Sequence, residues 1–120
     1  MTTIKSYTDL QQSKKLAEIL PLESADMKWF FWKEEIDAPK PPTFGYSKTA
    51  AESYKNTEAV YLPCWSLTAL FNIFPNENML VKTTDGKYYC LAKDVMTMHY
   101  DNPIDACVAT IEYLHKLKML

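Results

Sequence analysis

The sequence predicts a mixed α+β fold in one domain over residues 1–120, and three observations support this. The chain is 48% hydrophobic and 23% charged, as compact globular domains are. Apolar residues recur at helical spacing near both ends, and Asp85-Gly86 between two strand-like runs indicates a β-hairpin. We expect a central apolar helix and a C-terminal helix to pack on a small antiparallel three-stranded meander, with an amphipathic helix at the N-terminal end.

Capping residues and prolines predict the bounds of three helices. Thr8 followed by Gln11 has the spacing of a capping box, which predicts that the first helix begins there. Residues 62–75 are apolar on nearly every side and are bracketed by prolines, as expected for a central buried helix. Pro103, directly after an Asp-Asn pair that can cap it, begins a last helix that is expected to reach the end of the sequence. The predicted core comprises Trp65, Leu67, Leu70, Phe71, Phe74, Ile104, Val108, Ile111 and Leu114.

The meander is predicted from turn chemistry. A two-residue turn at Asp85-Gly86 would place Val81 opposite Cys90. A third strand over Val95–Tyr100 would complete the sheet. Residues 38–58 are rich in proline and polar side chains, so an irregular segment is expected there.

Four consecutive aromatic residues, Trp29, Phe30, Phe31 and Trp32, are the candidate binding residues. Their strand propensity predicts a β-strand over 27–33. Because side chains alternate in a strand, Trp29 and Phe31 would face one way and Phe30 and Trp32 the other. One pair then needs cover outside the main core, either a binding partner or the loop through Phe44 and Tyr46 folding back over it. The sequence therefore favours a small non-enzymatic interaction module that binds a protein partner or a second copy of itself.

The alternative function is a thiol-dependent enzyme centred on Cys64. This residue follows Pro63 at the start of the predicted central helix, where the helix dipole would lower a thiol's pKa, with His99 or His115 as base. Against it, cysteine is commonly a small buried hydrophobic residue, and apolar neighbours flank Cys64. No residue is assigned a catalytic role, and whether the protein is an enzyme stays open.

Charge and spacing argue against several other classes. All 13 cationic residues are lysine and the net charge is −2, which disfavours nucleic acid as a partner. The two glycines cannot form a dinucleotide-binding or phosphate-binding loop. The three cysteines lack the spacing of disulfide frameworks or zinc motifs, so we expect reduced thiols, no metal and no cofactor. Neither a signal peptide nor a membrane-spanning run is evident, which predicts a cytoplasmic protein.

The chain resembles a group of small uncharacterised proteins of gut Bacteroides-type bacteria and their phages or mobile elements. Four segments carry the resemblance: Ser6–Asp9, Leu16–Pro21, Pro63–Leu67 and Asn102–Val108. They are spread over the length of the chain, and their order is more specific than any one of them. The resemblance implies a bacterial or phage origin and assigns no activity and no site residue.

Overall fold

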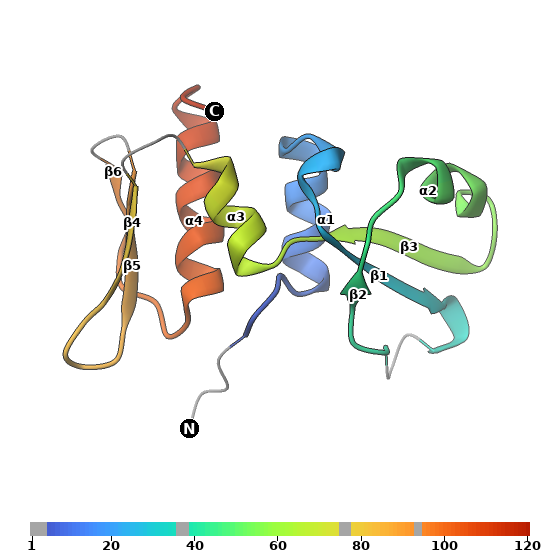
Figure 1. Ribbon diagram of the computed structural model, residues 1–120, viewed down its shortest axis with the longest axis horizontal. Coiled ribbons are helices and arrows are strands. Elements are labelled where there is room, and N and C mark those ends of the chain that lie inside the picture. Colours follow the sequence, from blue (N-terminus) through green and yellow to red (C-terminus); the bar gives the residue numbers. More distant parts are fainter. Residues whose placement is uncertain (1–4, 36–38, 75–77, 93–94) are drawn as a thin grey trace. The chain divides into compact units, whose positions relative to one another are not determined.

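Figure 1 shows the computed structural model of the chain, which describes residues 5–35, 39–74, 78–92 and 95–120. Within these residues there are four α-helices and two small antiparallel three-stranded sheets, so the fold belongs to the mixed α+β class that the sequence predicts. The chain forms two compact units, each with its own sheet. One unit is Thr8–Ser66, and the other combines Leu67–Leu120 with the described part of Met1–Tyr7.

The Thr8–Ser66 unit is built around β1 (Met27–Trp32), the aromatic strand expected from the sequence. β1 is the middle strand in the order β2-β1-β3 and pairs antiparallel with both neighbours. β3 (Ala59–Cys64) pairs along the whole of β1, whereas β2 (Thr43–Phe44) pairs only with its first two residues. β1 is therefore held mainly by β3.

Helix α1 (Leu10–Ile19) packs against β3 in this unit and begins one residue later than the predicted capping box. Asp9, rather than Thr8, is the N-cap: its carboxylate accepts the Gln12 N–H, and the Gln12 side chain accepts the Asp9 N–H. The Thr8 hydroxyl accepts the Trp65 N–H instead, at 3.1 Å. Because that bond fixes Thr8 outside the helix, the capping box begins at Asp9, one residue later than predicted.

Residues 38–58, which we predicted to be irregular, contain two regular elements, β2 and α2 (Lys48–Tyr54); residue 38 itself lies outside the described residues. Ser47 caps α2, since its hydroxyl accepts the Ala50 N–H at 3.2 Å. The helix contains no buried residue but contacts β3. Its sequence therefore lacks the apolar stripe by which helices are recognised.

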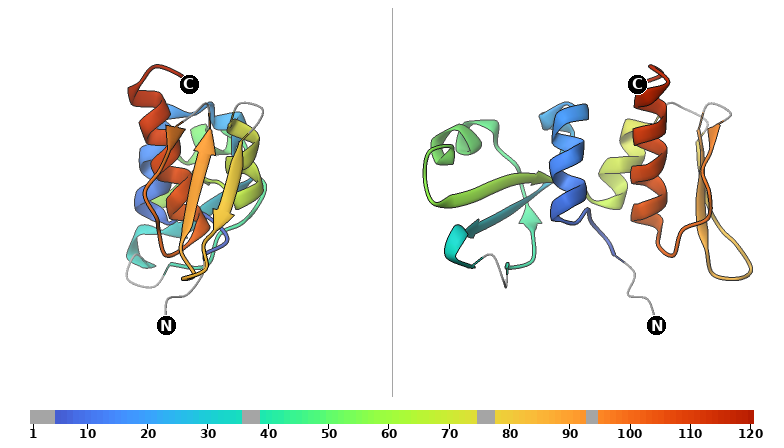
Figure 2. Two further views of the ribbon diagram at one scale, coloured as in Figure 1. Left: turned by 90° about the vertical axis from the view of Figure 1, so that its left-hand side faces the viewer. Right: turned by 180° about the vertical axis from the view of Figure 1, so that it is seen from behind.

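In the second unit, α4 (Pro103–Lys116) lies between a sheet and α3 (Leu67–Ile73), as Figures 1 and 2 show. The sheet has the order β4-β5-β6 and is the expected meander, with β4 at Met79–Lys82, β5 at Tyr88–Ala92 and β6 at Val95–Met96. α4 contacts β5 and β6, and α3 packs on α4. α3, the helical part of the predicted central helix, thus packs on α4.

The predicted central helix over residues 62–75 is only partly correct. Residues through Cys64 belong to β3, and α3 begins at Leu67 and ends at Ile73. An apolar run without clear periodicity suits a buried strand as well as a buried helix, and pairing with β1 decides in favour of the strand. Pro75, expected to end the helix, lies outside the described residues.

The hairpin between β4 and β5 forms where expected but with another register, because Leu80 rather than Val81 lies opposite Cys90. The loop has three residues instead of two, closed by the Thr83 N–H bonding to the Lys87 carbonyl at 2.8 Å. Its last residue, Gly86, has φ +81°, as in the common three-residue hairpin loop. One extra loop residue shifts the pairing by one position and exchanges the two faces of β4.

The third strand of the meander is shorter than predicted, since regular pairing ends at Met96. The chain then bonds to β5 at Thr97 and again at Tyr100. Between these positions Met98 and His99 lie opposite one residue of β5. This two-against-one arrangement is a β-bulge.

The N-terminal end of α4 matches the prediction, with the Asn102 side chain as cap followed by the expected proline. The helix ends at Lys116 instead of continuing to the end of the sequence. Lys118 adopts φ +61°, and the Met119 N–H bonds back to the Leu114 carbonyl at 2.9 Å. This is the Schellman arrangement that terminates helices.

Most of the predicted core is confirmed, whereas Leu67 and Phe71 are half-buried. The predicted residues that are buried are Trp65, Leu70, Phe74, Ile104, Val108, Ile111 and Leu114. Within the part of the chain that the structure describes, no helix is long and apolar enough to cross a membrane.

Candidate functional site

Five aromatic side chains lie together on one side of the β1–β3 pair, and we call this surface the aromatic face. Phe30 and Trp32 come from β1, and Tyr61 lies directly opposite Phe30 on β3. Tyr54 is the last residue of α2, and Tyr46 precedes its cap. The aromatic face therefore consists of Phe30, Trp32, Tyr46, Tyr54 and Tyr61.

Phe30 is the hub of this surface. Its ring meets those of Tyr54, Trp32 and Tyr61 edge to face, with centroid separations of 5.1, 5.9 and 6.0 Å. Tyr61 also stacks on Tyr54 at 5.9 Å and lies 5.5 Å from Tyr46. Edge-to-face pairs at these separations are attractive beyond the area they bury, so the rings hold one another in place.

Hydrogen bonding ties the helix that covers this surface to the strand beneath it. The Ser47 N–H donates to the Tyr61 hydroxyl at 3.1 Å, directly before α2 begins. Burial raises the pKa of the nearby Tyr46 phenol, with the Tyr61 and Glu52 side chains adding to the effect. The phenol is therefore neutral at physiological pH and can donate a hydrogen bond.

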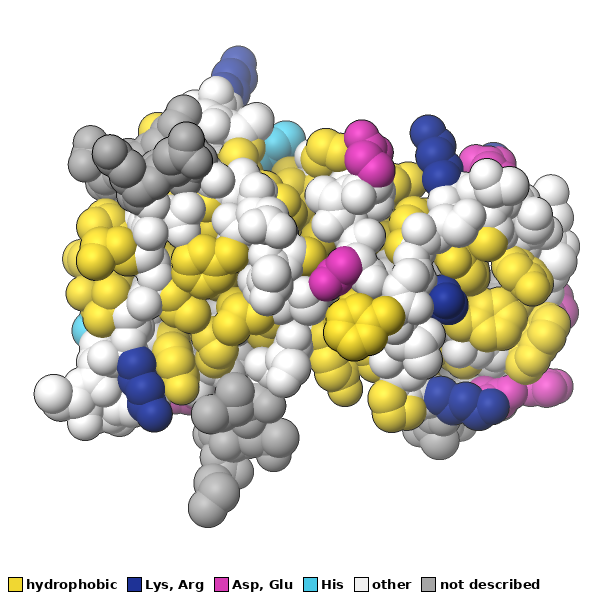
Figure 3. Space-filling model, in the orientation of Figure 1, with side chains coloured by type: hydrophobic (Ala, Val, Ile, Leu, Met, Phe, Trp, Pro, Cys, Tyr) yellow, Lys and Arg dark blue, Asp and Glu magenta, His cyan; other side chains and the backbone are white. Residues whose placement is uncertain are grey.

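Trp32 is the most exposed part of the aromatic face, with 43% of its surface accessible. The other four rings are half-buried. Trp32 lies opposite Ala59, and the chain continues at this end of the sheet into the exposed Lys33 and from the exposed Glu58. In Figure 3, hydrophobic side chains with lysine and acidic side chains around them occupy the area where Figure 1 draws α2, β1 and β3. An apolar centre thus lies beside a charged edge.

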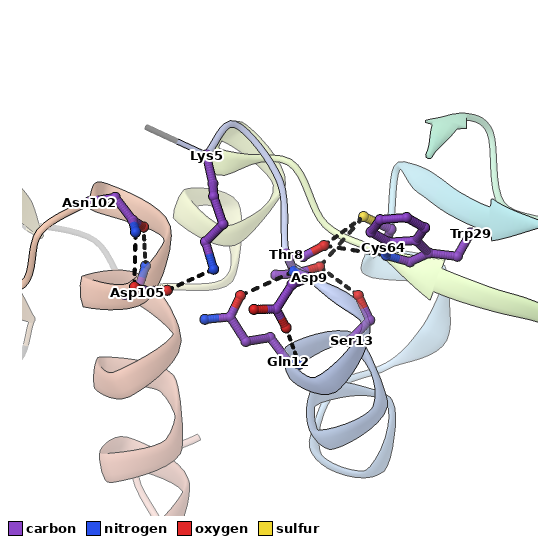
Figure 4. A network of polar contacts seen from close by, with 9 residues as sticks. All are labelled: Lys5, Thr8, Asp9, Gln12, Ser13, Trp29, Cys64, Asn102 and Asp105. Atoms are coloured by element: carbon purple, nitrogen blue, oxygen red, sulfur yellow. Dashed lines mark hydrogen bonds and ion pairs between the residues drawn. The ribbon is translucent and has the colours of Figure 1, made fainter. Parts of the chain in front are cut away.

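Trp29 and Phe31, the other two candidate binding residues, point to the opposite side of β1 and are buried. The Trp29 indole N–H donates to the Thr8 carbonyl at 3.3 Å, and the Thr8 and Ser13 hydroxyls bond at 2.8 Å (Figure 4). These contacts belong to the interior of the Thr8–Ser66 unit. The alternation expected from the sequence is thus present, and it separates an interior pair from an outer pair.

The alternative in which the loop through Phe44 and Tyr46 folds back over the outer aromatic pair is correct in part. Tyr46 covers the outer side of the sheet as that alternative supposed, through its contact with Tyr61. Phe44 does not: it pairs with Met27 at the other end of β1 and is 75% exposed. Phe30 is covered by Tyr54, which lies on a helix within the segment that was expected to be irregular.

Cys64 does not occupy the position on which the thiol-enzyme alternative was based. It is the last residue of β3, not the first turn of a helix, and it is fully buried. Its sulfur lies 3.4 Å from the Thr8 carbonyl, to which the thiol donates (Figure 4). Burial raises the pKa of the Cys64 thiol, partly offset by hydrogen bonds from the Thr8 and Ser13 side chains. The thiol is therefore protonated and shielded at neutral pH.

The second unit contains a cavity of about 510 Å³ between the β6 region and α4. Its lining is uncharged and comprises Val95, Met96, Thr97, Met98, Tyr100, Ala109, Tyr113 and Leu117. No group of three or more His, Cys, Asp or Glu side chains that could hold a metal ion occurs in residues 5–35, 39–74, 78–92 and 95–120.

Comparisons of the chain with protein-family models, with curated proteins and with solved structures find no match. The candidate site therefore depends on the geometry of the aromatic face alone.

Sequence reasoning missed Tyr54 and Tyr61 as members of the site. Tyr61 was assigned to the residues before the central helix and Tyr54 to an irregular segment, so neither was placed beside Phe30. One signal was present: Tyr54 follows Ala50 and Ala51 at helical spacing. The strand partner of Phe30 had no comparable signal, because long-range pairing is not encoded in local spacing.

Proposed function

We propose that this protein is a non-enzymatic interaction module that binds a protein partner through the aromatic face, with Trp32 at the centre of the contact. A second copy of the chain is the simplest such partner, because one self-complementary patch on each copy can form a twofold dimer. The single observation that carries the proposal is the 43% exposure of Trp32 beside an already packed cluster of rings.

The packing of the cluster favours binding. An exposed tryptophan that must be ordered on association loses conformational freedom, which weakens the contact. Here Trp32 already meets Phe30 edge to face at 5.9 Å, and Phe30 is held in turn by Tyr54. Tryptophan and tyrosine are also the residues that most often dominate the binding energy of protein interfaces.

The surroundings of Trp32 favour a protein over a nucleic acid. Lys33 and Glu58 put both charge signs at the edge of the patch, which is typical of the polar rim around an apolar contact centre. The chain has no arginine and a net charge of −2, so attraction to a phosphate backbone is weak. An accessory role in a bacterial or phage-infected cytoplasm completes the proposal and rests on the sequence segments named above.

Of the four candidate binding residues from the sequence, the proposal keeps two, Phe30 and Trp32. Trp29 and Phe31 are 8% and 3% exposed, so a partner cannot reach them without unfolding the unit. Phe30 and Trp32 carry the contact, with the three tyrosines of the aromatic face positioning them.

Replacing Trp32 by alanine tests the proposal, with Phe44→Ala as the matched control because it removes an exposed ring outside the aromatic face. Sedimentation of the wild type should shift with concentration, and Trp32→Ala should weaken this association at least tenfold, as loss of a hot-spot residue does. Phe44→Ala should associate like the wild type, and both variants should keep the wild-type circular dichroism spectrum and melting temperature to within a few degrees.

A partner of another kind would appear in affinity capture from the native cytoplasm. The wild type and Phe44→Ala should retain the same protein, and Trp32→Ala should lose it. The proposal is contradicted if the wild type stays monomeric and captures nothing, or if both alanine variants behave alike.

A further inference from the structure

Cys90 and Cys107 form a thiol pair that the proposed function does not use. Cys90 lies on β5 and Cys107 on α4, in the second unit, and their sulfur atoms are 3.5 Å apart. Both side chains are buried, with exposures of 1% and 0%. The pair lies where the helix packs on the meander, since α4 contacts β5 directly.

The two thiols are not equivalent. A hydrogen bond from the Cys107 thiol lowers the pKa of Cys90, and this bond together with burial raises the pKa of Cys107. Cys90 is therefore suited to be the attacking sulfur, and Cys107 holds a proton beside it.

We propose that Cys90 and Cys107 are a site of reversible oxidation, at which hydrogen peroxide converts the two thiols into a disulfide that joins β5 to α4. In the first step the Cys90 thiolate attacks one peroxide oxygen, the O–O bond breaks, and the hydroxide that leaves takes a proton to become water. In the second step the Cys107 sulfur attacks the sulfur of the Cys90 sulfenic acid, and the sulfenic hydroxyl takes the proton of the Cys107 thiol and leaves as a second water. Together the two thiols lose two electrons, and these electrons reduce one hydrogen peroxide to two waters.

The geometry requires little movement for this bond. A disulfide brings the sulfur atoms to about 2.0 Å, so the present 3.5 Å separation must shorten by about 1.5 Å. Burial slows the reaction, because peroxide must reach the pair during local opening of the short meander. We expect formation over minutes to hours and reversal by added dithiol.

The bond would close a loop that contains β6 and the beginning of α4. The two cysteines are 17 positions apart in the sequence, and a loop of this length restricts the unfolded chain. The oxidised protein should therefore melt about 10 °C higher than the reduced one. Cys64 contacts Thr8 and not another thiol, so it provides an internal comparison within the same chain.

The test treats the folded wild type with hydrogen peroxide, then unfolds it in N-ethylmaleimide and analyses it by intact mass and peptide mapping. The expected product carries one maleimide, on Cys64, and a peptide pair linked through Cys90 and Cys107. The variant Cys64→Ser should form the same link. In Cys107→Ser the link is absent and dimedone should instead label the Cys90 sulfenic acid.

A parallel sample oxidised in urea distinguishes a preformed pair from random coupling, and it needs no variant to fold. The unfolded chain should give all three pairings, whereas the folded chain gives one. The proposal is overturned if the folded protein yields the same mixture as the unfolded one, if Cys64 is oxidised first, or if all three thiols remain free after hours in millimolar peroxide.

Discussion

Replacing Leu70 by alanine tests the packing of α3 on α4. Leu70 is fully buried in α3, and α3 packs on α4. The change removes three carbon atoms, worth about 2.4 kcal/mol of transfer free energy at roughly 0.8 kcal/mol each. A fully enclosed site collapses only in part, and the remaining cavity should bring the loss of unfolding free energy to about 3–5 kcal/mol.

Urea unfolding followed by far-ultraviolet circular dichroism would measure this loss. Leu67→Ala is the matched control, because Leu67 begins the same helix but is only half-buried, and it should cost about 1 kcal/mol. The slope of unfolding free energy against urea should stay unchanged in both variants. A Leu70→Ala effect below about 1 kcal/mol, or equal to that of Leu67→Ala, would refute the assigned packing of α3.

Two backbone positions give further predictions. Gly86→Val should lower the unfolding free energy by about 1 kcal/mol or more, whereas Gly86→Asn should lose less, because asparagine tolerates positive φ. No atom lies within 4 Å of an added Cβ at Gly86, so steric contact does not contribute, and equal melting temperatures for both variants would contradict the turn. Lys118→Gly should raise the unfolding free energy by about 0.5–1 kcal/mol, because glycine adopts the φ of +61° without strain. Lys118→Ala should leave it nearly unchanged in urea unfolding, and a gain as large as that of Lys118→Gly would exclude the left-handed helix end.

The alternation of the aromatic strand is the part of the candidate site that could be predicted from sequence. A strand has a fixed period of two, so the division into Trp29 with Phe31 and Phe30 with Trp32 needs no tertiary information. Which pair faces outward did require the structure. Trp29 is interior because α1 packs on the sheet through β3 and the Trp29 indole bonds to Thr8 just before that helix, and no local pattern around Trp29 records these contacts.

Other elements were missed because local signals were degenerate. Asp85-Gly86 is compatible with hairpin loops of two and of three residues, and the Thr83–Lys87 bond selects the longer one. The run from Leu62 to Cys64 suits a buried helix or a buried strand equally well. Helix α2 has little apolar surface to recognise, since its stability comes from capping by Ser47 and contact with β3. In each case a long-range contact decided between local alternatives.

The bulge at Met98 and His99 affects the tendency of this protein to aggregate through the edge of its meander. β6 is an outer strand, and a regular outer strand displays a row of backbone donors and acceptors onto which strands of other molecules can be added. Here the row is regular for only two residues before the bulge disrupts it. Met96 and Met98, 64% and 80% exposed, thus lie on a border that is poorly suited to templating fibrillar growth. The meander can therefore expose flexible apolar side chains without presenting a regular edge to which strands of other molecules could pair.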